Sequence, residues 1–200
     1  MTADQFKTTD YFDPMVVRIL DSAEQCIERY GIRRTSMGEV ARVGKLSRGS
    51  IYRHFGDKQA LVDGVFRRRQ EAFLNRTEAA MELEDSLVDK LTLAVVAGRR
   101  DATEGLFARL AETEPETVAM IFLTPDFYRR SVSFWPAHIR MAQEQGEIAA
   151  GLDVSAATDF LMRLAVSLVM FPNMGVELKT RASLQTYLQR VICSGLGELA

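Results

Sequence analysis

The amino-acid sequence predicts an all-α protein with a small N-terminal three-helix domain and a larger helical domain behind it. Apolar residues recur at intervals of three and four along most of the chain, which is the spacing of one buried helix face, and no stretch alternates as a β-strand does. Residues whose side chains cap helices stand ahead of these apolar runs. The chain has 200 residues, of which 47 % are apolar and 26 % charged, so it can bury one substantial core or two small ones.

The first helix is expected over residues 14–30. Asp13 can accept hydrogen bonds from the free amides of the first turn, and Pro14 is tolerated at the first helical position. Gly31 suits the left-handed conformation that often ends a helix. The apolar positions of this helix share one face: Val16, Ile19, Leu20, Ala23, Ile27 and Tyr30.

Three further helix starts follow closely. Ser36 opens a segment of the capping-box form, because Glu39 stands three residues later. Ser47 and Asp57 each precede another helical pattern, and Gly56 separates the two. The sequence therefore predicts four closely spaced helices in its first third.

Two domains are expected. The first covers residues 14–60, and a long fourth helix over about 57–75 links it to a second domain over 76–200. Arg67 to Arg69 and Glu71 are expected to face outward on the linking helix. Later helices are expected from Leu87 to a stop at Gly98 to Asp101, at about 103–112, at 116–145 with a break at Thr124-Pro125, at 154–171 and at 181–196.

Basic residues gather in the first domain. Between Arg29 and Arg69 the chain carries eleven basic and three acidic residues, an excess of eight. Since the net charge of the whole chain is −2, the remaining residues carry −10. This asymmetry favours a polyanionic partner, because each neutralised phosphate releases condensed counterions. A basic face that serves only solubility is the alternative.

The short helix that begins at Ser47 has an unusual outer side. Ile51 and Phe55 are four residues apart and must face the core together with Leu46. On the outer side, Gly49 costs the helix roughly 0.5 to 1 kcal/mol relative to alanine, a loss that is understandable if a rigid object such as DNA approaches its backbone. Recognition helices place their first residues against base edges in the major groove. The candidates for base contact are Ser47, Arg48, Gly49 and Ser50.

Groups suited to phosphate surround this helix. The candidates for phosphate contact are Thr35, Ser36, Lys45, Tyr52, His54 and Lys58. Such contacts position a protein on DNA without specifying sequence, whereas Arg48 can read a guanine in bidentate fashion. Tyr52 and His54 have a second interpretation as packing residues.

No catalytic, metal-binding or cofactor-binding set is expected. His54 and His138 are the only histidines, and neither has the spacing of a metal ligand or a nucleophile partner nearby. Cys26 and Cys193 lie in apolar helical patterns and are expected to be packing residues. The sequence therefore predicts a protein that is not an enzyme and needs no cofactor.

No membrane span or secretory signal is expected. The longest strongly apolar stretch, Leu164 to Phe171, is far shorter than the roughly 20 residues that cross a bilayer, and Pro172 closes it. The first ten residues lack the apolar run of a secretory signal. We therefore expect a cytoplasmic protein.

The segment from Arg18 to Arg69 resembles the helix-turn-helix DNA-binding domain of the tetracycline-repressor (TetR-type) family of transcriptional regulators. The resemblance covers about a quarter of the chain and rests on a specific string that starts at Thr35: Thr-Ser-Met…Val-Ala…Leu-Ser-Arg-Gly-Ser-Ile-Tyr-Arg-His-Phe-Gly-Asp-Lys-Gln-Ala-Leu. One position departs from the family, which usually has glycine in the turn where this chain has Lys45, just ahead of Leu46. A left-handed residue other than glycine costs on the order of 1 kcal/mol there, or the turn is rearranged.

The resemblance implies that residues from about 76 onward form a regulatory domain that binds a small molecule and dimerises. In the family the last two helices pair with their two-fold mates as a four-helix bundle, and here those helices carry long apolar rows. The dimer-interface candidates are Phe160, Leu164, Leu168, Leu184, Leu188 and Val191. A homodimer would read a palindrome in double-stranded DNA whose half-sites lie about one helical turn apart.

Large, soft side chains in the central helices are candidates for an effector pocket: Phe107, Met120, Phe122, Phe127, Phe134, Trp135, Met141, Met162 and Met170. Such side chains line apolar ligand cavities, but they also fill cores. Thr124-Pro125 and Trp135-Pro136 are expected to break the central helix and to open room for a ligand. We therefore expect a small, apolar effector.

Together these features predict a homodimeric repressor that a small effector releases from a palindromic operator. Effector binding would favour a spacing of the recognition helices that no longer fits the groove. The alternative is a helical small-molecule-binding or protein-interaction module whose helix-turn-helix is vestigial, and such a module would show no salt-dependent DNA binding.

Overall fold

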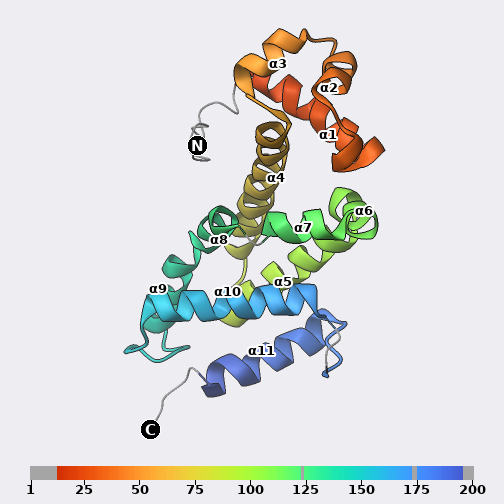
Figure 1. Ribbon diagram of the computed structural model, residues 1–200. Coiled ribbons are helices and arrows are strands. Elements are labelled where there is room, and N and C mark those ends of the chain that lie inside the picture. Colours follow the sequence, from red (N-terminus) through yellow and green to blue (C-terminus); the bar gives the residue numbers. More distant parts are fainter. Residues whose placement is uncertain (1–12, 123, 173–174, 196–200) are drawn as a thin grey trace. The chain divides into compact units, whose positions relative to one another are not determined.

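The computed structural model describes residues 13–122, 124–172 and 175–195, and the regular structure in these residues is helical throughout, as the sequence predicts (Figure 1). The helices in chain order are α1 (Pro14–Arg34), α2 (Met37–Gly44), α3 (Arg48–His54), α4 (Lys58–Met81), α5 (Leu87–Thr103), α6 (Gly105–Thr113), α7 (Pro115–Phe122), α8 (Pro125–Val132), α9 (Trp135–Glu144), α10 (Val154–Met170) and α11 (Arg181–Gly195). Among the described residues, no helix has both the length and the apolar character that a membrane span requires.

Side-chain caps set the helix starts. A backbone N–H of the first turn donates to the cap in each case: Met15 to Asp13 at 2.7 Å, Glu39 to Ser36 at 3.2 Å, Ser50 to Ser47 at 3.0 Å, Ala60 to Asp57 at 2.8 Å and Asp89 to Ser86 at 3.1 Å. Each cap satisfies an amide that has no partner within its helix. The four starts predicted in the first third of the chain are confirmed.

Two helices run further than the sequence predicts. α4 continues past residue 75 to Met81, because its last turns carry buried side chains, with Thr77 4 % and Met81 0 % exposed. The predicted stop of α5 at Gly98 to Asp101 comes slightly too early, since the helix continues to Thr103. Gly98 lies inside it, and a Cβ atom there would lie 2.8 Å from Cγ2 of Val169. The glycine thus allows close packing of α10 against α5.

The chain forms two compact units. Unit 1 comprises Met1–Ala72 and Leu106–Leu123, and unit 2 comprises Phe73–Gly105 and Thr124–Ala200. The boundary between the units at residues 72 and 73 lies close to residue 76, where the second domain is predicted to start. However, α6 and α7 belong to unit 1. They do so because their apolar side chains, among them Leu106 and Leu110, complete the core built by α1 to α4.

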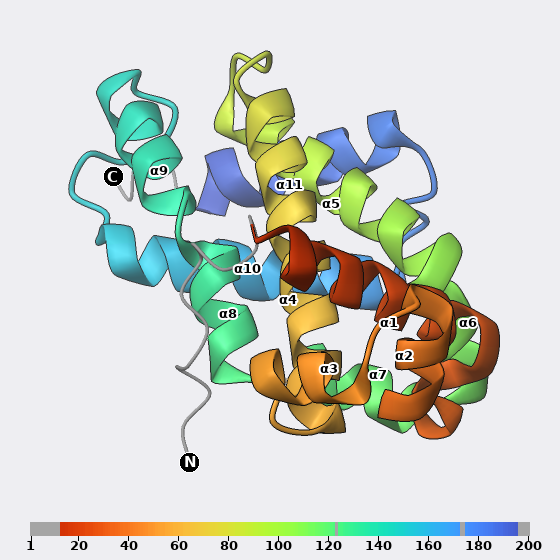
Figure 2. The ribbon, with the colours of Figure 1, turned by 90° about the horizontal axis from the view of Figure 1, so that it is seen from above.

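Unit 2 is built around α5. Helices α10 and α11 both pack on α5, and α8 and α9 contact α10 (Figure 2). Its core includes Trp135, Ile139, Leu161, Leu184 and Leu188, each at most 2 % exposed. The break predicted at Trp135-Pro136 is confirmed, because α8 ends at Val132 and α9 begins at residue 135.

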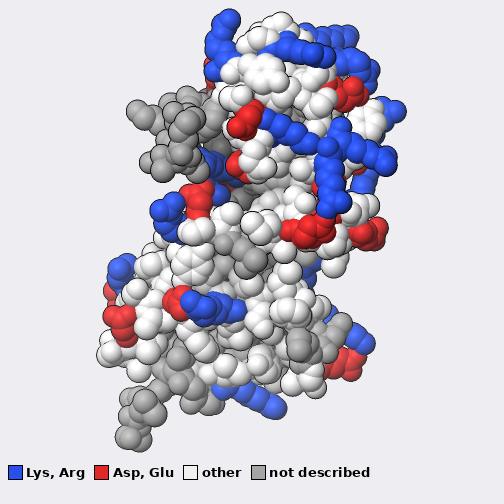
Figure 3. Space-filling view, viewed as in Figure 1, with Lys and Arg blue, Asp and Glu red and all other residues white. Residues whose placement is uncertain are grey.

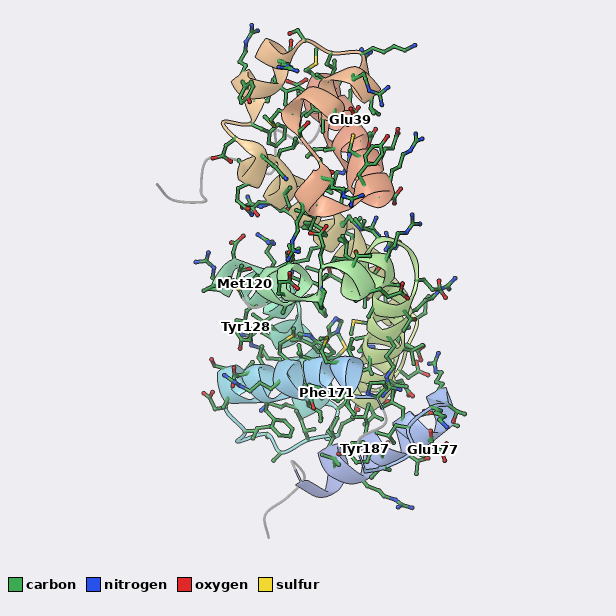
Figure 4. All side chains as sticks on the ribbon, turned by 45° about the vertical axis from the view of Figure 1, so that its right-hand side comes forward. Glu39, Met120, Tyr128, Phe171, Glu177 and Tyr187 are labelled. Atoms are coloured by element: carbon green, nitrogen blue, oxygen red, sulfur yellow. The ribbon has the colours of Figure 1, made fainter. Side chains whose placement is uncertain are left out.

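Polar side chains tie the helices of unit 2 together. The Arg99 guanidinium of α5 donates to the carbonyl oxygens of Leu168 and Leu178, near the two ends of the α10–α11 connection, and its burial lowers the pKa of the group. The Tyr128 hydroxyl of α8 donates to Asp159 of α10 at 2.5 Å, and this hydrogen bond raises the pKa of the phenol (Figure 4 labels Tyr128).

A buried histidine lies in the same unit. His138 of α9 is 6 % exposed, packs against the rings of Phe134 and Trp135, and its Nδ1 has no hydrogen-bond partner among the described residues. Burial, and to a smaller degree the charge of Lys90, lower its pKa below the ordinary value, although Glu82 and Glu78 oppose the shift. The charged form of His138 is therefore disfavoured in the folded protein.

Unit 2 should lose stability on acidification through His138. Because the folded protein has the lower pKa, the unfolded chain binds more protons below the ordinary value of about 6.5. Stability should therefore be fully present above that pH and fall as the pH drops toward the lowered pKa. Urea unfolding can be followed through Trp135, the single tryptophan of the chain. His138→Leu should flatten this pH dependence; an equal acid loss in wild-type and His138→Leu protein would contradict the assignment.

Candidate nucleic-acid interface

A tight turn leads from α1 into α2. Gly31 departs from helical geometry at φ 80° and ψ 169°, so the predicted end of the first helix at this glycine is confirmed, and a short further turn runs to Arg34. The Thr35 hydroxyl donates to the carbonyl oxygen of Gly31 at 2.7 Å. The Thr35 N–H also donates to the carbonyl oxygens of Gly31 and Ile32, at 3.2 Å each. These hydrogen bonds fix the point at which α2 begins.

A buried carboxylate supports this turn. Glu114, between α6 and α7, is 5 % exposed, and its two oxygens accept from the Arg33 N–H at 3.2 and 3.3 Å. A Cβ atom at Gly31 would overlap Oε1 of Glu114. Sequence reasoning missed this contact, because 81 positions separate its partners and the one local signal is that Glu114 stands before Pro115 at a helix start.

The first turn of α2 carries an ion pair on its surface. Glu39 accepts from Nε and Nη2 of Arg42 at 3.1 and 2.6 Å. These hydrogen bonds hold the pKa of Glu39 below its ordinary value. Ser36 caps α2 as the predicted capping box requires. The side chain of Glu39, the other member of that box, pairs with Arg42.

Lys45 forms the turn between α2 and α3. It adopts the left-handed conformation at φ 51° and ψ 46°, and the Leu46 N–H donates to the carbonyl oxygen of Ala41 at 2.9 Å. This is the geometry that the family usually obtains with glycine, so the departure at Lys45 leaves the turn intact. The lysine conformation costs on the order of 1 kcal/mol.

α3 has an inward side and an outward side, as its spacing predicts. Ile51 and Phe55 are both 0 % exposed in the core of unit 1, and Leu46 packs against that core. Outward, Tyr52 is 52 % exposed. We call the exposed or half-exposed residues of this side the α3 outer face; they are Ser47, Arg48, Gly49, Ser50, Tyr52 and Arg53.

The four base-contact candidates lie together at the start of the α3 outer face. The hydroxyls of Ser47 and Ser50 lie 2.9 Å apart and share one hydrogen bond. A Cβ atom at Gly49 would meet only the Ser47 hydroxyl, at 3.8 Å, so nothing inside the protein requires a glycine here. The low bulk at Gly49 therefore still favours the close approach of an external partner.

The phosphate candidates differ in accessibility. Ser36, Lys45 and Tyr52 are exposed, and His54 is half-buried. Lys58 is half-buried and its Nζ donates to the carbonyl oxygen of Arg33 at 2.9 Å. Thr35 is 2 % exposed, and its hydroxyl would have to leave the bond to Gly31 before it could reach a phosphate.

Part of the basic charge of unit 1 is neutralised internally. Arg68 contacts Asp21 and Glu24 at 2.7 Å each, and Arg69 also pairs with Glu24. The prediction that these two arginines simply face outward is wrong, because they tie α4 to α1. Their side chains are only 22 % and 24 % exposed.

Other cations remain available. In and beside the α2–α3 segment, the exposed basic side chains without a hydrogen-bond or ion-pair partner among the described residues are Arg34, Lys45, Arg48 and Arg53. Lys and Arg side chains gather over the surface formed by α1 to α3 (Figure 3). Unpaired positive charge is thus available on the α3 outer face and in the turns beside it.

The predicted effector-pocket residues divide between the two units. Phe107 packs in the core of unit 1 beside Phe66, Met120 is 67 % exposed on α7 (Figure 4), and the side chain of Phe122 lies outside the described residues. The remaining six belong to unit 2. Of these six, Trp135 is buried, and Phe127, Phe134 and Met162 are half-buried. Met141 and Met170 are 44 % and 48 % exposed.

A cavity of about 480 Å³ occurs elsewhere, in unit 1. It is lined by residues 27–31, 33 and 34 of α1 and by residues of the 106–114 segment, and by none of the predicted pocket residues. Sequence reasoning had no signal for it, because the two lining segments are distant in the chain.

The predicted dimer-interface residues also fall into two groups. Leu168, Leu184 and Leu188 are buried in the core of unit 2. Leu164 and Val191 are half-buried, and Phe160 is 41 % exposed. Further exposed apolar side chains on or next to α10 are Val166, Met170 and Phe171, of which Figure 4 labels Phe171.

Comparison with known proteins agrees with this geometry. The family described as bacterial regulatory proteins, tetR family, matches residues 19–65. The HTH-type transcriptional regulator UidR of Escherichia coli (strain K12) is 25 % identical over 157 residues, which cover 76 % of this chain and 78 % of UidR.

Two solved structures show the same fold over almost the whole chain. A TetR-family transcriptional regulator from Pectobacterium atrosepticum aligns with a TM-score of 0.71 at 20 % identity and covers 95 % of this chain and 97 % of that one. The transcriptional regulator FadR from Bacillus subtilis, in complex with stearoyl-CoA, aligns with a TM-score of 0.58 at 18 % identity and covers 90 % of this chain and 98 % of that one.

With the helix-turn-helix, its outward polar side and these relatives considered together, the protein is a DNA-binding transcriptional regulator. Its relatives are named as regulators, which points away from an enzyme. Residues 19–65 match the tetR family, and the resemblance carried by the segment from Thr35 to Leu61 is confirmed.

Gly31→Ala should destabilise unit 1 by roughly 1 to 3 kcal/mol, because alanine would meet both the left-handed backbone and the Glu114 carboxylate. Amide hydrogen exchange in α1 and α2 measures the loss. Gly146→Ala is the matched control, since Gly146 has φ 73° with open space around it, and it should cost unit 2 less. Adding Glu114→Ala to Gly31→Ala should cost less than the sum of the single changes; strict additivity would show that the two residues do not interact.

Proposed function

We propose that this regulator is a homodimeric repressor that occupies a palindromic operator and is released by a small, apolar effector. One observation carries the DNA part of the proposal: the buried side of α3 anchors the helix while its outer face presents solvent-accessible polar groups around Gly49. A helix held in this way can enter the major groove without losing its support. Repression then follows from occupying DNA that the transcription machinery needs.

Base reading belongs to the first turn of α3. Arg48 is exposed and unpaired among the described residues, so its five N–H donors are available for a guanine. The hydroxyls of Ser47 and Ser50 exchange one hydrogen bond with each other and can still engage base edges or bridging water. These groups would specify sequence.

Phosphate contacts would come from the residues around the α3 outer face. Tyr52 and Ser36 offer exposed hydroxyls, and Lys45 offers a free ammonium group. The Lys58 ammonium uses one N–H for the Arg33 carbonyl and retains two more for a phosphate oxygen. Such contacts would add affinity for any sequence and make binding depend on salt.

Footprinting on the DNA that flanks the gene of this protein tests the proposal directly. Two related half-sites, with centres about 10 base pairs or a multiple apart, should be protected, and protection should weaken as salt rises. Absence of salt-dependent binding would overturn the proposal and favour a vestigial helix-turn-helix.

Lys58→Ala should weaken binding to all DNA sequences alike and reduce the slope of log affinity against log salt by about 1 per site. Arg48→Ala should instead relax the preference for one base pair of each half-site. Arg190→Ala on α11 removes the same charge from an exposed site far along the chain, so it should leave the slope unchanged. Equal slopes in wild-type and Lys58→Ala protein would remove Lys58 from the phosphate set.

A second copy of the chain is the proposed partner of α10. Phe160 and Leu164 lie four residues apart on one side of the helix, and Met170 with the C-cap residue Phe171 extends this apolar stripe to the end of the helix. Three of these four are 41 to 57 % exposed, which is unusual for large apolar side chains that repeat on one stripe. A two-fold pair also matches the symmetry of a palindrome. The buried leucines among the predicted interface residues would then support this stripe from within.

Phe160→Glu should therefore shift the protein toward monomer and weaken operator binding, because a carboxylate in an apolar interface is left unpaired. Size-exclusion chromatography with light scattering measures the mass. Leu83→Glu is the control, since Leu83 is 85 % exposed in the α4–α5 connection and should leave the mass unchanged. A Phe160→Glu protein that remains dimeric would exclude this stripe.

The effector is proposed to be apolar and to bind in unit 2. Phe127, Phe134 and Met162 are half-buried there, which leaves part of each apolar side chain accessible. The relative FadR was solved with stearoyl-CoA, a ligand with a long apolar chain. Repeating the footprint with fatty acyl compounds and with small charged metabolites tests this point, and release by charged compounds alone would overturn it.

A further inference from the structure

The Arg48 guanidinium lies across a glycine of the neighbouring helix. A Cβ atom at Gly38, in the first turn of α2, would lie 2.7 Å from Nη2, 3.2 Å from Cζ and 3.3 Å from Nε of Arg48. The Nε–Nη2 edge of the guanidinium therefore occupies the space that a side chain at Gly38 would need. Real Cβ atoms are almost never found as close as 2.7 Å to another heavy atom, so an alanine here would displace the group.

No other described group holds Arg48 in this position. Arg48 makes no hydrogen bond or ion pair within the described residues. The carboxylate nearest in the chain on α2, Glu39, is already engaged by Arg42. The position that the guanidinium takes beside Gly38 therefore depends on the space that the missing Cβ atom leaves.

We propose that Gly38 is a specificity-determining position of the DNA interface that acts by positioning Arg48, an inference that rests on the proposed DNA-binding function. A bidentate contact with guanine needs two hydrogen bonds of about 2.7 to 3.2 Å at once. A recognition group must be held within about 0.5 Å of its productive place. To reach an ordinary contact of about 3.4 Å or more with a new methyl group, Nη2 would have to move by more than that.

The cost of this displacement would appear in recognition and not in stability. The atom that a new methyl group at Gly38 would meet is the far end of an exposed, flexible side chain, so Arg48 can swing away without disturbing the core. Alanine is also a better helix former than glycine. A merely structural role for Gly38 predicts the opposite pattern, with lost stability and an unchanged base preference.

Binding selection from a pool of randomised operators, with full-length protein, tests the proposal. Gly38→Ala should relax preference at the same base pair as Arg48→Ala, by roughly ten-fold, which is within the range of one lost bidentate contact. In the Arg48→Ala background, Gly38→Ala should have no further effect. Gly56→Ala is the matched control, because no atom lies within 4 Å of a Cβ there, and it should keep the wild-type preference. The thermal midpoint of the Gly38→Ala protein should not fall below that of the wild type.

The outcomes separate this inference from the function on which it rests. An unchanged base preference in the Gly38→Ala protein, beside a relaxed one in the Arg48→Ala protein, would overturn the role of Gly38 and leave the proposed function standing. An effect of Gly38→Ala that persists without Arg48, or that weakens all sequences equally, would overturn it as well. Failure of the wild-type protein to select any sequence would overturn the proposed function itself.

Discussion

The surface proposed to face DNA depends on the burial of two side chains, Ile51 and Phe55, under α3. This helix has seven residues, and isolated helices of fewer than about 12 residues are marginal in water. Both side chains are fully buried, which supplies the stability that the helix lacks by itself. Apart from Ser47, which caps the helix, the residues of the outer face make no contribution to the core. A glycine and two serines can stand there for that reason.

The turn ahead of α3 sets the direction in which that surface points. Lys45 accepts a left-handed backbone, and the bond from the Leu46 N–H to the Ala41 carbonyl closes α2. At the other end of α2, the chain enters through Gly31 and Thr35, with Glu114 on the Arg33 N–H. Hydrogen bonds of the backbone thus define the position of α2 at both of its ends. They thereby also define where Gly38 lies relative to Arg48.

Local signals in the sequence predicted the helix starts and the two sides of α3, because caps and apolar spacing act over a few residues. Ser36, Ser47 and Asp57 are examples, and each caps as expected. Contacts between distant segments carried no such signal: the pairing of Arg68 with Glu24, and the carboxylate of Glu114 on α1, became visible only in three dimensions. The burial of the Thr35 hydroxyl was equally invisible, since a side chain that looks free in a motif can be used by the turn that contains it.

The discontinuity of unit 1 has a consequence for biosynthesis. Phe66 packs on Phe107, and Leu106 and Leu110 belong to the same core, so the DNA-binding half cannot close that core until α6 has emerged from the ribosome. Translation must therefore pass through α5 before the first unit is complete. A fragment that ends at Ala72 would carry the whole α3 outer face and yet expose the apolar patch that α6 and α7 cover. The segment that holds this face is shorter than the segment that must be made before it can fold.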